Sequence, residues 1–174
     1  MLERFITVRT NLPEVKAELL KFGIEIAPKI LRGATAAAAG VFKKLAISNA
    51  PVHSGRLRDA IYMVRIREQS GKGAEVYRIG VRSGKKQQKN NRDAFYWRWV
   101  EEGYWRRGPG SNLRRGKHSI RLQRARDKVS GRATRVQGQQ YLGRAFRDGQ
   151  ATALQRFYDV VEKRIKRENK ARSK

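Results

Sequence analysis

Apolar positions near the N-terminus follow a helical period. Residues 5–8 alternate and predict an edge strand, and Asn11 then has the character of a helix N-cap, with Pro13 in the first turn. The apolar side chains that follow recur every three or four residues and share one helical face: Val15, Leu19, Phe22, Ile26 and Ile30. Pro28 interrupts the pattern and predicts either a kink or the start of a second helix.

An alanine-rich stretch from Lys29 to Asn49 continues the helical pattern. Its small and apolar residues predict a face that another backbone can approach closely: Ile30, Ala34, Ala37, Val41 and Leu45. Pro51 ends the helix, because a residue before proline avoids the helical region. Two antiparallel helices and one kinked helix of about 35 residues are both compatible with this pattern.

The period then changes to two and later returns to a helical spacing. Residues 61–67 and 75–81 predict two strands, with Tyr77, Ile79 and Val81 on one face and residues 69–73 as a hairpin loop. From Tyr141 onward, apolar residues predict a C-terminal amphipathic helix: Ala145, Phe146, Leu154, Phe157, Val161 and Ile165. We therefore expect an α+β fold, in which an N-terminal helix or kinked helix pair packs on a small, mainly antiparallel sheet closed by the C-terminal helix.

The densest aromatic segment, FYWRWVEEG at residues 95–103, allows two interpretations. Aromatic side chains interleaved with arginine could stack on single-stranded bases. Alternatively Phe95, Trp97 and Trp99, at a period of two, form the inward face of a sheet. We favour the core interpretation, because the sequence offers no evident second stacking platform.

Charge is the strongest compositional signal. The 174 residues include 41 Lys and Arg against 15 Asp and Glu, which gives a net charge of +26. Self-repulsion of this size opposes compaction, so we expect a polyanionic partner, of which nucleic acid is the commonest. The simpler alternative is a basic protein that its charge keeps in solution.

Residues 106–135 concentrate this charge. They hold one acid, Asp127, and eleven bases that we take as candidate DNA- or partner-contacting residues: Arg106, Arg107, Arg114, Arg115, Lys117, Arg121, Arg124, Arg126, Lys128, Arg132 and Arg135. With few apolar residues the segment predicts a flexible loop, which is either simply solvated or orders on DNA or on an acidic neighbouring subunit. No base-reading motif is present, so any nucleic-acid contact should be independent of sequence.

Catalysis has little support in the sequence. Cysteine is absent, and the two histidines, His53 and His118, lie far apart. The acids of the β region match no metal-ligand spacing: Asp59, Glu75, Asp93, Glu101 and Glu102. We expect no enzyme activity, cofactor or metal. The chain also lacks a signal-peptide layout and an apolar run of membrane-spanning length, so we expect a soluble protein that stays in the cell that makes it and has no membrane partner.

Three segments, taken in order, resemble one family: APVHSGRLRDAI at residues 50–61, FYWRWVEEG at 95–103 and YLGRAF at 141–146. They are similar to the neck, or tail-completion, proteins of phages with long non-contractile tails, the group that includes minor tail protein Z. Ser54 stands where that family commonly has Thr, Tyr104 where Thr is usual, and Gly143-Arg144 where Arg-Pro is frequent. The connection from Gly103 to Tyr141 is also longer and more basic than the resemblance leads us to expect.

The resemblance implies a structural virion protein that assembles in the host cytoplasm as a homo-oligomeric, hexameric ring at the head–tail junction. Its partners would be head-connector proteins, tail-terminator or tail-tube proteins, and DNA in the channel. We expect a single neck-protein domain over residues 1–174, with a basic flexible insertion at 104–138 and a basic tail at 163–174. Arg56, Arg58, Glu101 and Glu102 are candidate subunit-interface residues, although the acids could equally be solvated. A sequence-independent nucleic-acid-binding protein is the competing hypothesis, because the charge supports it equally well.

Overall fold

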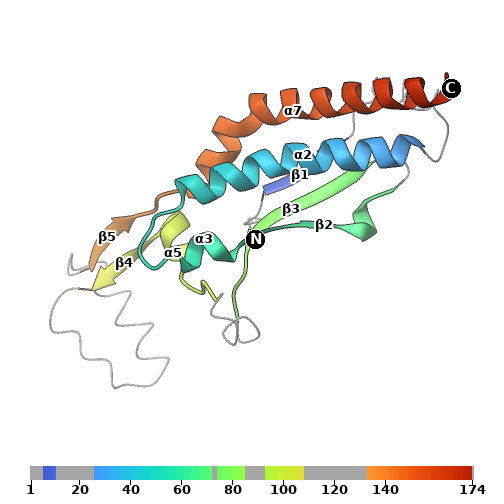
Figure 1. Cartoon of the computed structure of the whole chain (residues 1–174). Helices are drawn as coiled ribbons and strands as arrows, with labels where there is room; N and C mark the ends of the chain where they lie inside the picture. Colours follow the sequence, from blue (N-terminus) through green and yellow to red (C-terminus); the bar gives the residue numbers. More distant parts are fainter. Residues whose placement is uncertain (1–5, 11–25, 72–73, 85–92, 108–132, 174) are drawn as a thin grey trace. The chain divides into compact units, whose positions relative to one another are not determined.

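The computed structural model describes residues 6–10, 26–71, 74–84, 93–107 and 133–173. Two compact units are present: residues 1–95 with 141–174 form unit 1, and residues 96–140 form unit 2. Helices combine with a small antiparallel sheet and a long C-terminal helix, so the predicted α+β class is confirmed (Figure 1).

The sheet of unit 1 has three antiparallel strands in the order β1-β3-β2. Strand β1 (Ile6–Thr10) is at one edge, as predicted, and β2 (Ile61–Arg65) is at the other. The central strand β3 (Glu75–Val81) has the predicted bounds, and only Arg78 among its residues is not buried. Strand β2 ends two residues earlier than expected, because a 3-10 turn, η1 (Arg67–Gln69), leads from it into the hairpin.

The alanine-rich helix α2 (Ile26–Asn49) ends directly before Ala50-Pro51, as predicted. Pro28 lies in its first turn, and the helix predicted from Asn11 onward lies outside the described residues. Helix α2 packs against both the sheet and the C-terminal helix (Figure 1). The buried band of α2 only partly coincides with the predicted face. Ala37, Val41 and Leu45 are half-buried, and the residues that follow each of them are buried instead. The buried residues of the helix are Ile30, Leu31, Ala34, Thr35, Ala38, Ala39, Phe42 and Ala46.

Helix α7 (Tyr141–Arg172) runs along α2, and the predicted basic tail falls largely on its last turns. Its buried side is formed mainly by residues spaced at three or four: Tyr141, Leu142, Ala145, Ala153, Phe157 and Val161. Phe146 and Leu154, which the sequence suggested as inward-facing, are 42% and 50% exposed. They lie beside the buried stripe and not within it, because the stripe drifts around a straight helix.

Glycine permits the close approach of the two helices. A Cβ atom on Gly149 of α7 would lie 2.8 Å from Leu45 Cδ1 and 2.9 Å from Phe42 Cδ1 of α2. Nearer the other end of the pair, the Arg164 side chain lies over Gly33 and donates a hydrogen bond of 2.8 Å to the Lys29 carbonyl. The helices therefore contact each other along much of their length in a fixed antiparallel register.

A buried ion pair joins the two hairpin strands. The Glu75 carboxylate, whose side chain is 3% exposed, accepts hydrogen bonds of 2.6 and 2.7 Å from Arg65 Nε and Nη2. These bonds raise the pKa of the Arg65 guanidinium above its ordinary value. Arg32 of α2 approaches the same carboxylate at 3.8 Å, so this one acid connects the sheet to the helix.

Unit 2 consists of helix α5 (Trp97–Glu102) followed by two antiparallel strands, β4 (Gly103–Arg107) and β5 (Ala133–Gln137). The prediction that Phe95, Trp97 and Trp99 form the inward face of a sheet is wrong. Trp97 is buried, but Phe95 and Trp99 are 63% and 53% exposed, and the segment from Trp97 is helical. On a helix, residues two apart point in different directions, so a period of two cannot bury all three rings.

Candidate functional site

The turn after α2 positions Arg56 and Arg58. Gly55 has a φ of 75°, the left-handed conformation that glycine tolerates best, and helix α3 (Arg56–Ala60) begins directly after it. Arg58 Nε and Nη2 donate hydrogen bonds of 3.1 and 3.0 Å to the Ala50 carbonyl, and Nη2 reaches the Ser48 carbonyl at 3.4 Å. Its positive charge thus lies at the C-terminal end of α2, where the helix dipole favours a cation.

Arg58 therefore has a role within the chain, whereas Arg56 is exposed. The assignment of both residues to a subunit interface stays a prediction. Arg56 is the better candidate of the two, because the Arg58 guanidinium already contacts the carbonyls at the end of α2.

The two candidate acids end helix α5. Glu102 is exposed and Glu101 is half-buried. Their backbone carbonyls accept hydrogen bonds from β5 and from the segment that follows it. Arg135 Nη2 of β5 donates to Glu102 O at 2.7 Å, and Gln140 N donates to Glu101 O at 3.1 Å. The interface role of these carboxylates also stays a prediction.

Gly103 and Gly138 allow the backbone at the end of α5 to approach the backbone at the end of β5 closely. Gly103 has a φ of 80°, and a Cβ atom there would lie 2.3 Å from the Val136 carbonyl oxygen. A Cβ atom on Gly138 would lie 2.3 Å from the Glu101 carbonyl oxygen. Both contacts are with backbone, which cannot move aside as a side chain does, so glycine is required at both positions.

The β4–β5 ribbon carries the described part of the predicted basic segment. Arg106 and Arg135 are exposed on it, Arg107 is the last residue of β4, and β4 and β5 contain no acid. The remaining candidate contacts lie outside the described residues: Arg114, Arg115, Lys117, Arg121, Arg124, Arg126, Lys128 and Arg132. The sequence did not predict the ribbon itself, because 25 residues separate its strands and no short turn connects them.

Exposed aromatic side chains accompany these arginines. Trp105 lies directly across from Arg135 in the strand register, is 43% exposed, and has the Arg135 guanidinium 5.8 Å from its ring centroid. Trp99 and Tyr104 form a second pair, with ring centroids 6.4 Å apart and exposures of 53% and 43%. In the sequence, Tyr104-Trp105 stands directly before Arg106-Arg107, and this adjacency of aromatic and basic residues was the signal that could have located the ribbon.

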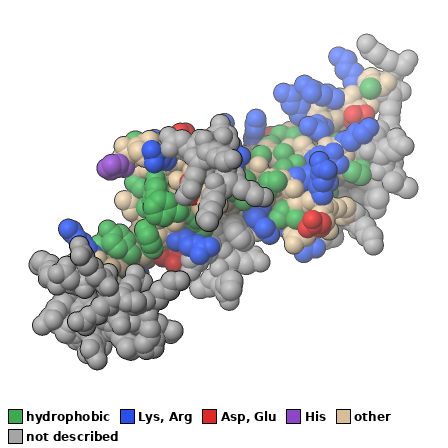
Figure 2. Space-filling model, turned by 90° about the horizontal axis from the view of Figure 1, so that it is seen from below, with side chains coloured by type: hydrophobic (Ala, Val, Ile, Leu, Met, Phe, Trp, Pro, Cys, Tyr) green, Lys and Arg blue, Asp and Glu red, His purple; other side chains and the backbone are tan. Residues whose placement is uncertain are grey.

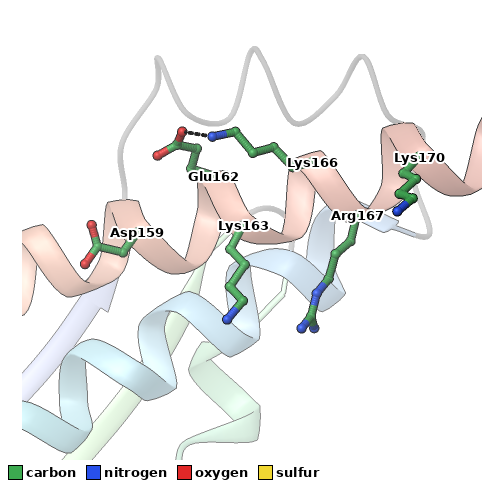
Figure 3. Close-up of a pocket in the computed structure, with 6 residues that line it drawn as sticks. All are labelled: Asp159, Glu162, Lys163, Lys166, Arg167 and Lys170. Atoms are coloured by element: carbon green, nitrogen blue, oxygen red, sulfur yellow. Dashed lines mark hydrogen bonds and ion pairs between the residues drawn. The ribbon is translucent and has the colours of Figure 1, made fainter.

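A second basic surface follows the last turns of α7. A shallow depression is lined by Asp159, Glu162, Lys163, Lys166, Arg167 and Lys170, whose side chains extend from one helix (Figure 3). Lys166 is paired with Glu162 one turn earlier. Figure 2, a view from below, shows Lys and Arg side chains spread over that face of the molecule, with few Asp or Glu among the described residues. Those that line the depression are flexible surface side chains on a single helix and do not form an enclosed site.

Catalytic groups do not gather in the described residues. No cluster of three or more His, Asp or Glu that could hold a metal ion occurs among them. His53 is exposed and His118 lies outside the described ranges. Of the helices that the structure describes, none is long and apolar enough to cross a membrane.

Comparison with known families gives a match that covers the helix–turn–sheet segment. Residues 6–103, from β1 to the first residue of β4, match the HK97-gp10-like family, described as "Bacteriophage HK97-gp10, putative tail-component". The chain belongs to this family. No curated protein and no solved structure matches it.

Membership of the HK97-gp10-like family makes the chain a bacteriophage tail component, a structural class of protein that works in the virion beside other virion proteins. The match contains the turn with Arg56 and Arg58 and all of α5 with Glu101 and Glu102. It ends where the basic ribbon begins, so β5 and α7 lie beyond it. The resemblance seen in the sequence to phage tail-completion proteins is therefore confirmed at the level of the family.

Proposed function

We propose that this tail component is a neck protein that completes the tail and joins it to the DNA-filled head. The family match over residues 6–103 carries the proposal, because it spans the turn at residues 50–61 and the segment at 95–103 through which the chain resembles tail-completion proteins. The role is structural: a connector needs binding surfaces and no catalytic group, cofactor or metal.

The neck role implies a closed homo-oligomeric ring, hexameric by resemblance, around the DNA channel. A ring is built from heterologous interfaces, in which two different surfaces of each subunit meet. Arg56 at the start of α3 and Glu102 at the end of α5 supply exposed groups of opposite sign. In the proposed ring, the acid of one copy pairs with the arginine of the next.

A charge exchange tests this pairing. Arg56→Glu alone and Glu102→Arg alone should each lower the fraction of ring seen by native mass spectrometry or negative-stain microscopy, and the double variant should recover it. Lys44→Glu is the matched control, because Lys44 is an exposed cation on α2 outside both surfaces. If the double variant assembles no better than the single variants, the proposed pairing is wrong.

The head–tail joining role is tested in the phage. When the chain is not produced, lysates should contain filled heads and finished tails lying apart, and added purified protein should join them. Neighbouring rings above and below are expected to be head-connector proteins and tail-terminator or tail-tube proteins, detectable by cross-linking in joined particles. Normally joined, infectious particles formed without the chain would refute the proposal.

The domain organisation is part of the same proposal. One neck domain spans residues 1–174, with a basic insertion at 104–138 and a basic tail at 163–174. In the ring, the insertion would be directed toward DNA in the channel or toward an adjacent ring.

A further inference from the structure

We infer that the face of the β4–β5 ribbon that carries Trp105 binds single-stranded nucleic acid without sequence preference. Stacking on the Trp105 ring and a contact from Arg135 to a phosphate would hold the strand. This inference concerns the ribbon alone and does not depend on a place at the head–tail junction.

The strand register places these two side chains together. Trp105 pairs directly with Arg135, so the two lie on the same face of the ribbon. Tyr104 and Arg106 alternate with Trp105 along β4 and point to the opposite face. One face of the ribbon thus combines an exposed indole ring with a guanidinium group.

Exposure distinguishes Trp105 from Trp97, which an arginine also approaches. Arg98 lies 5.4 Å from the ring centroid of Trp97, but Trp97 is only 5% exposed and cannot receive a base. Trp105 is 43% exposed while in contact with Arg135. A base needs an accessible aromatic surface, and an adjacent cation can bind the phosphate attached to it.

The position of Arg135 is held by two contacts. Its Nη2 donates a hydrogen bond of 2.7 Å to the Glu102 carbonyl, and its guanidinium lies 5.8 Å from the Trp105 ring centroid. Gly103 and Gly138 hold the same part of the ribbon against the end of α5. The cation and the ring are therefore placed before a ligand arrives, which lowers the entropy lost on binding.

Charge identifies the ligand class. Strands β4 and β5 carry three arginines and no acid, and residues 108–132 between them contain eight Lys or Arg and one acid. A second copy of a chain with net charge +26 is a poor partner for this surface. A polynucleotide supplies one negative charge per nucleotide together with an aromatic base, and so complements both the arginines and Trp105.

Binding of a labelled oligo(dT) to the full chain, followed by fluorescence anisotropy across a range of salt, tests the inference. Arg135→Gln should lower the slope of log affinity against log salt by about 0.7, the value for one phosphate contact on a single strand. Arg106→Gln removes the same charge on the opposite face of the ribbon and should change the slope much less. Equal effects of the two variants would show that only diffuse charge acts and would overturn the assignment.

Trp105→Ala should weaken oligo(dT) binding about tenfold, and Trp105→Phe should keep most of the affinity because it retains a ring that can stack. A mixed-sequence duplex of the same length is the second probe, and its affinity should be nearly the same for all three proteins. If Trp105→Ala leaves oligo(dT) binding unchanged, or weakens duplex binding equally, stacking on Trp105 is refuted. Failure of the native chain to bind oligo(dT) would overturn the inference and favour an acidic protein surface as the partner, without affecting the proposed neck role.

Discussion

Unit 1 and unit 2 are held together by different kinds of contact. In unit 1, the buried side chains of α2, α7 and β3 form an apolar core, and Glu75, the one buried acid among the residues that the structure describes, is paired with Arg65. In unit 2, most aromatic side chains remain about half exposed, and backbone hydrogen bonds and two required glycines connect the helix to the ribbon. Side-chain burial thus stabilises unit 1, whereas backbone geometry determines unit 2.

This difference matters because an isolated two-stranded ribbon is only marginally stable in water. Unit 2 keeps Trp99, Tyr104 and Trp105 accessible and so gives up burial that would have stabilised it. Such exposure is typical of a surface that binds a partner. Variants that destabilise one unit and leave the other intact would test whether the two units are stabilised in these different ways.

The largest effect is expected from Phe157→Ala in α7. Phe157 is 4% exposed, and truncating a buried phenylalanine costs about 4 kcal/mol of unfolding free energy. Chemical denaturation followed by far-ultraviolet circular dichroism measures the loss, and Tyr158→Ala, at a 41% exposed neighbouring position, is the control. If hydrogen exchange shows unit 2 losing protection in parallel, the two units unfold together, as the prediction of a single domain requires.

Gly103→Ala should affect unit 2 selectively. The left-handed φ of 80° and the approach to the Val136 carbonyl should cost about 3 kcal/mol locally. Hydrogen exchange should accelerate in residues 97–107 and 133–140 while α2 stays protected. Gly40→Ala is the matched control, because a Cβ atom there meets nothing within 4 Å, and it should stabilise α2 by about 0.7 kcal/mol. If hydrogen exchange in β4 and β5 is unchanged in Gly103→Ala, backbone geometry at Gly103 does not determine the stability of unit 2.

Glu75→Gln should destabilise unit 1 by about 2 kcal/mol, since hydrogen bonds to a charged group are lost at a buried position. The midpoint of urea denaturation measures this change. Glu162→Gln removes an exposed carboxylate paired with Lys166 and should change stability by less than about 0.5 kcal/mol. Similar losses in the two variants would show that burial of the Glu75 pair is unimportant.

The smallest effect concerns Tyr77. Burial, with the Glu75 charge adding to it, raises the pKa of the Tyr77 phenol above its ordinary value of 10.0. Since the folded-state pKa exceeds that of the unfolded chain, the associated stability is complete below about pH 10 and declines as the pH rises through the folded-state value. Tyr77→Phe should therefore show a shallower loss of stability at alkaline pH in paired denaturation curves. Parallel curves for the two proteins would contradict this.

Sequence patterns predicted unit 1 far better than unit 2. The end of α2 before Ala50-Pro51 and the bounds of β3 could be predicted from local rules. A proline stops a helix, and a period of two is typical of a strand. The N-terminal helix face and most of the basic segment lie outside the described residues.

The failures in unit 2 have a common physical cause. Three aromatic residues at a period of two suggested a strand, but the short helix buries Trp97 and leaves Phe95 and Trp99 exposed. Strands β4 and β5 pair across a long connection, which no short-range turn signal announces. The candidate arginines were predicted from charge alone. The position of Arg135 beside Trp105 depends on the strand register, which is a property of the folded chain.

The contacts between α2 and α7 have a mechanical consequence. Gly149 admits Phe42 and Leu45 at one point, and Arg164 reaches across Gly33 to the Lys29 carbonyl at another. These points are about 22 Å apart along α7, given the rise of an α-helix. Two separated contact points prevent α7 from sliding along α2 and from rotating about a single contact. A force on the end of α7 is therefore transmitted to α2 as shear, which many contacts share. A tail component that must withstand tension would benefit from this arrangement.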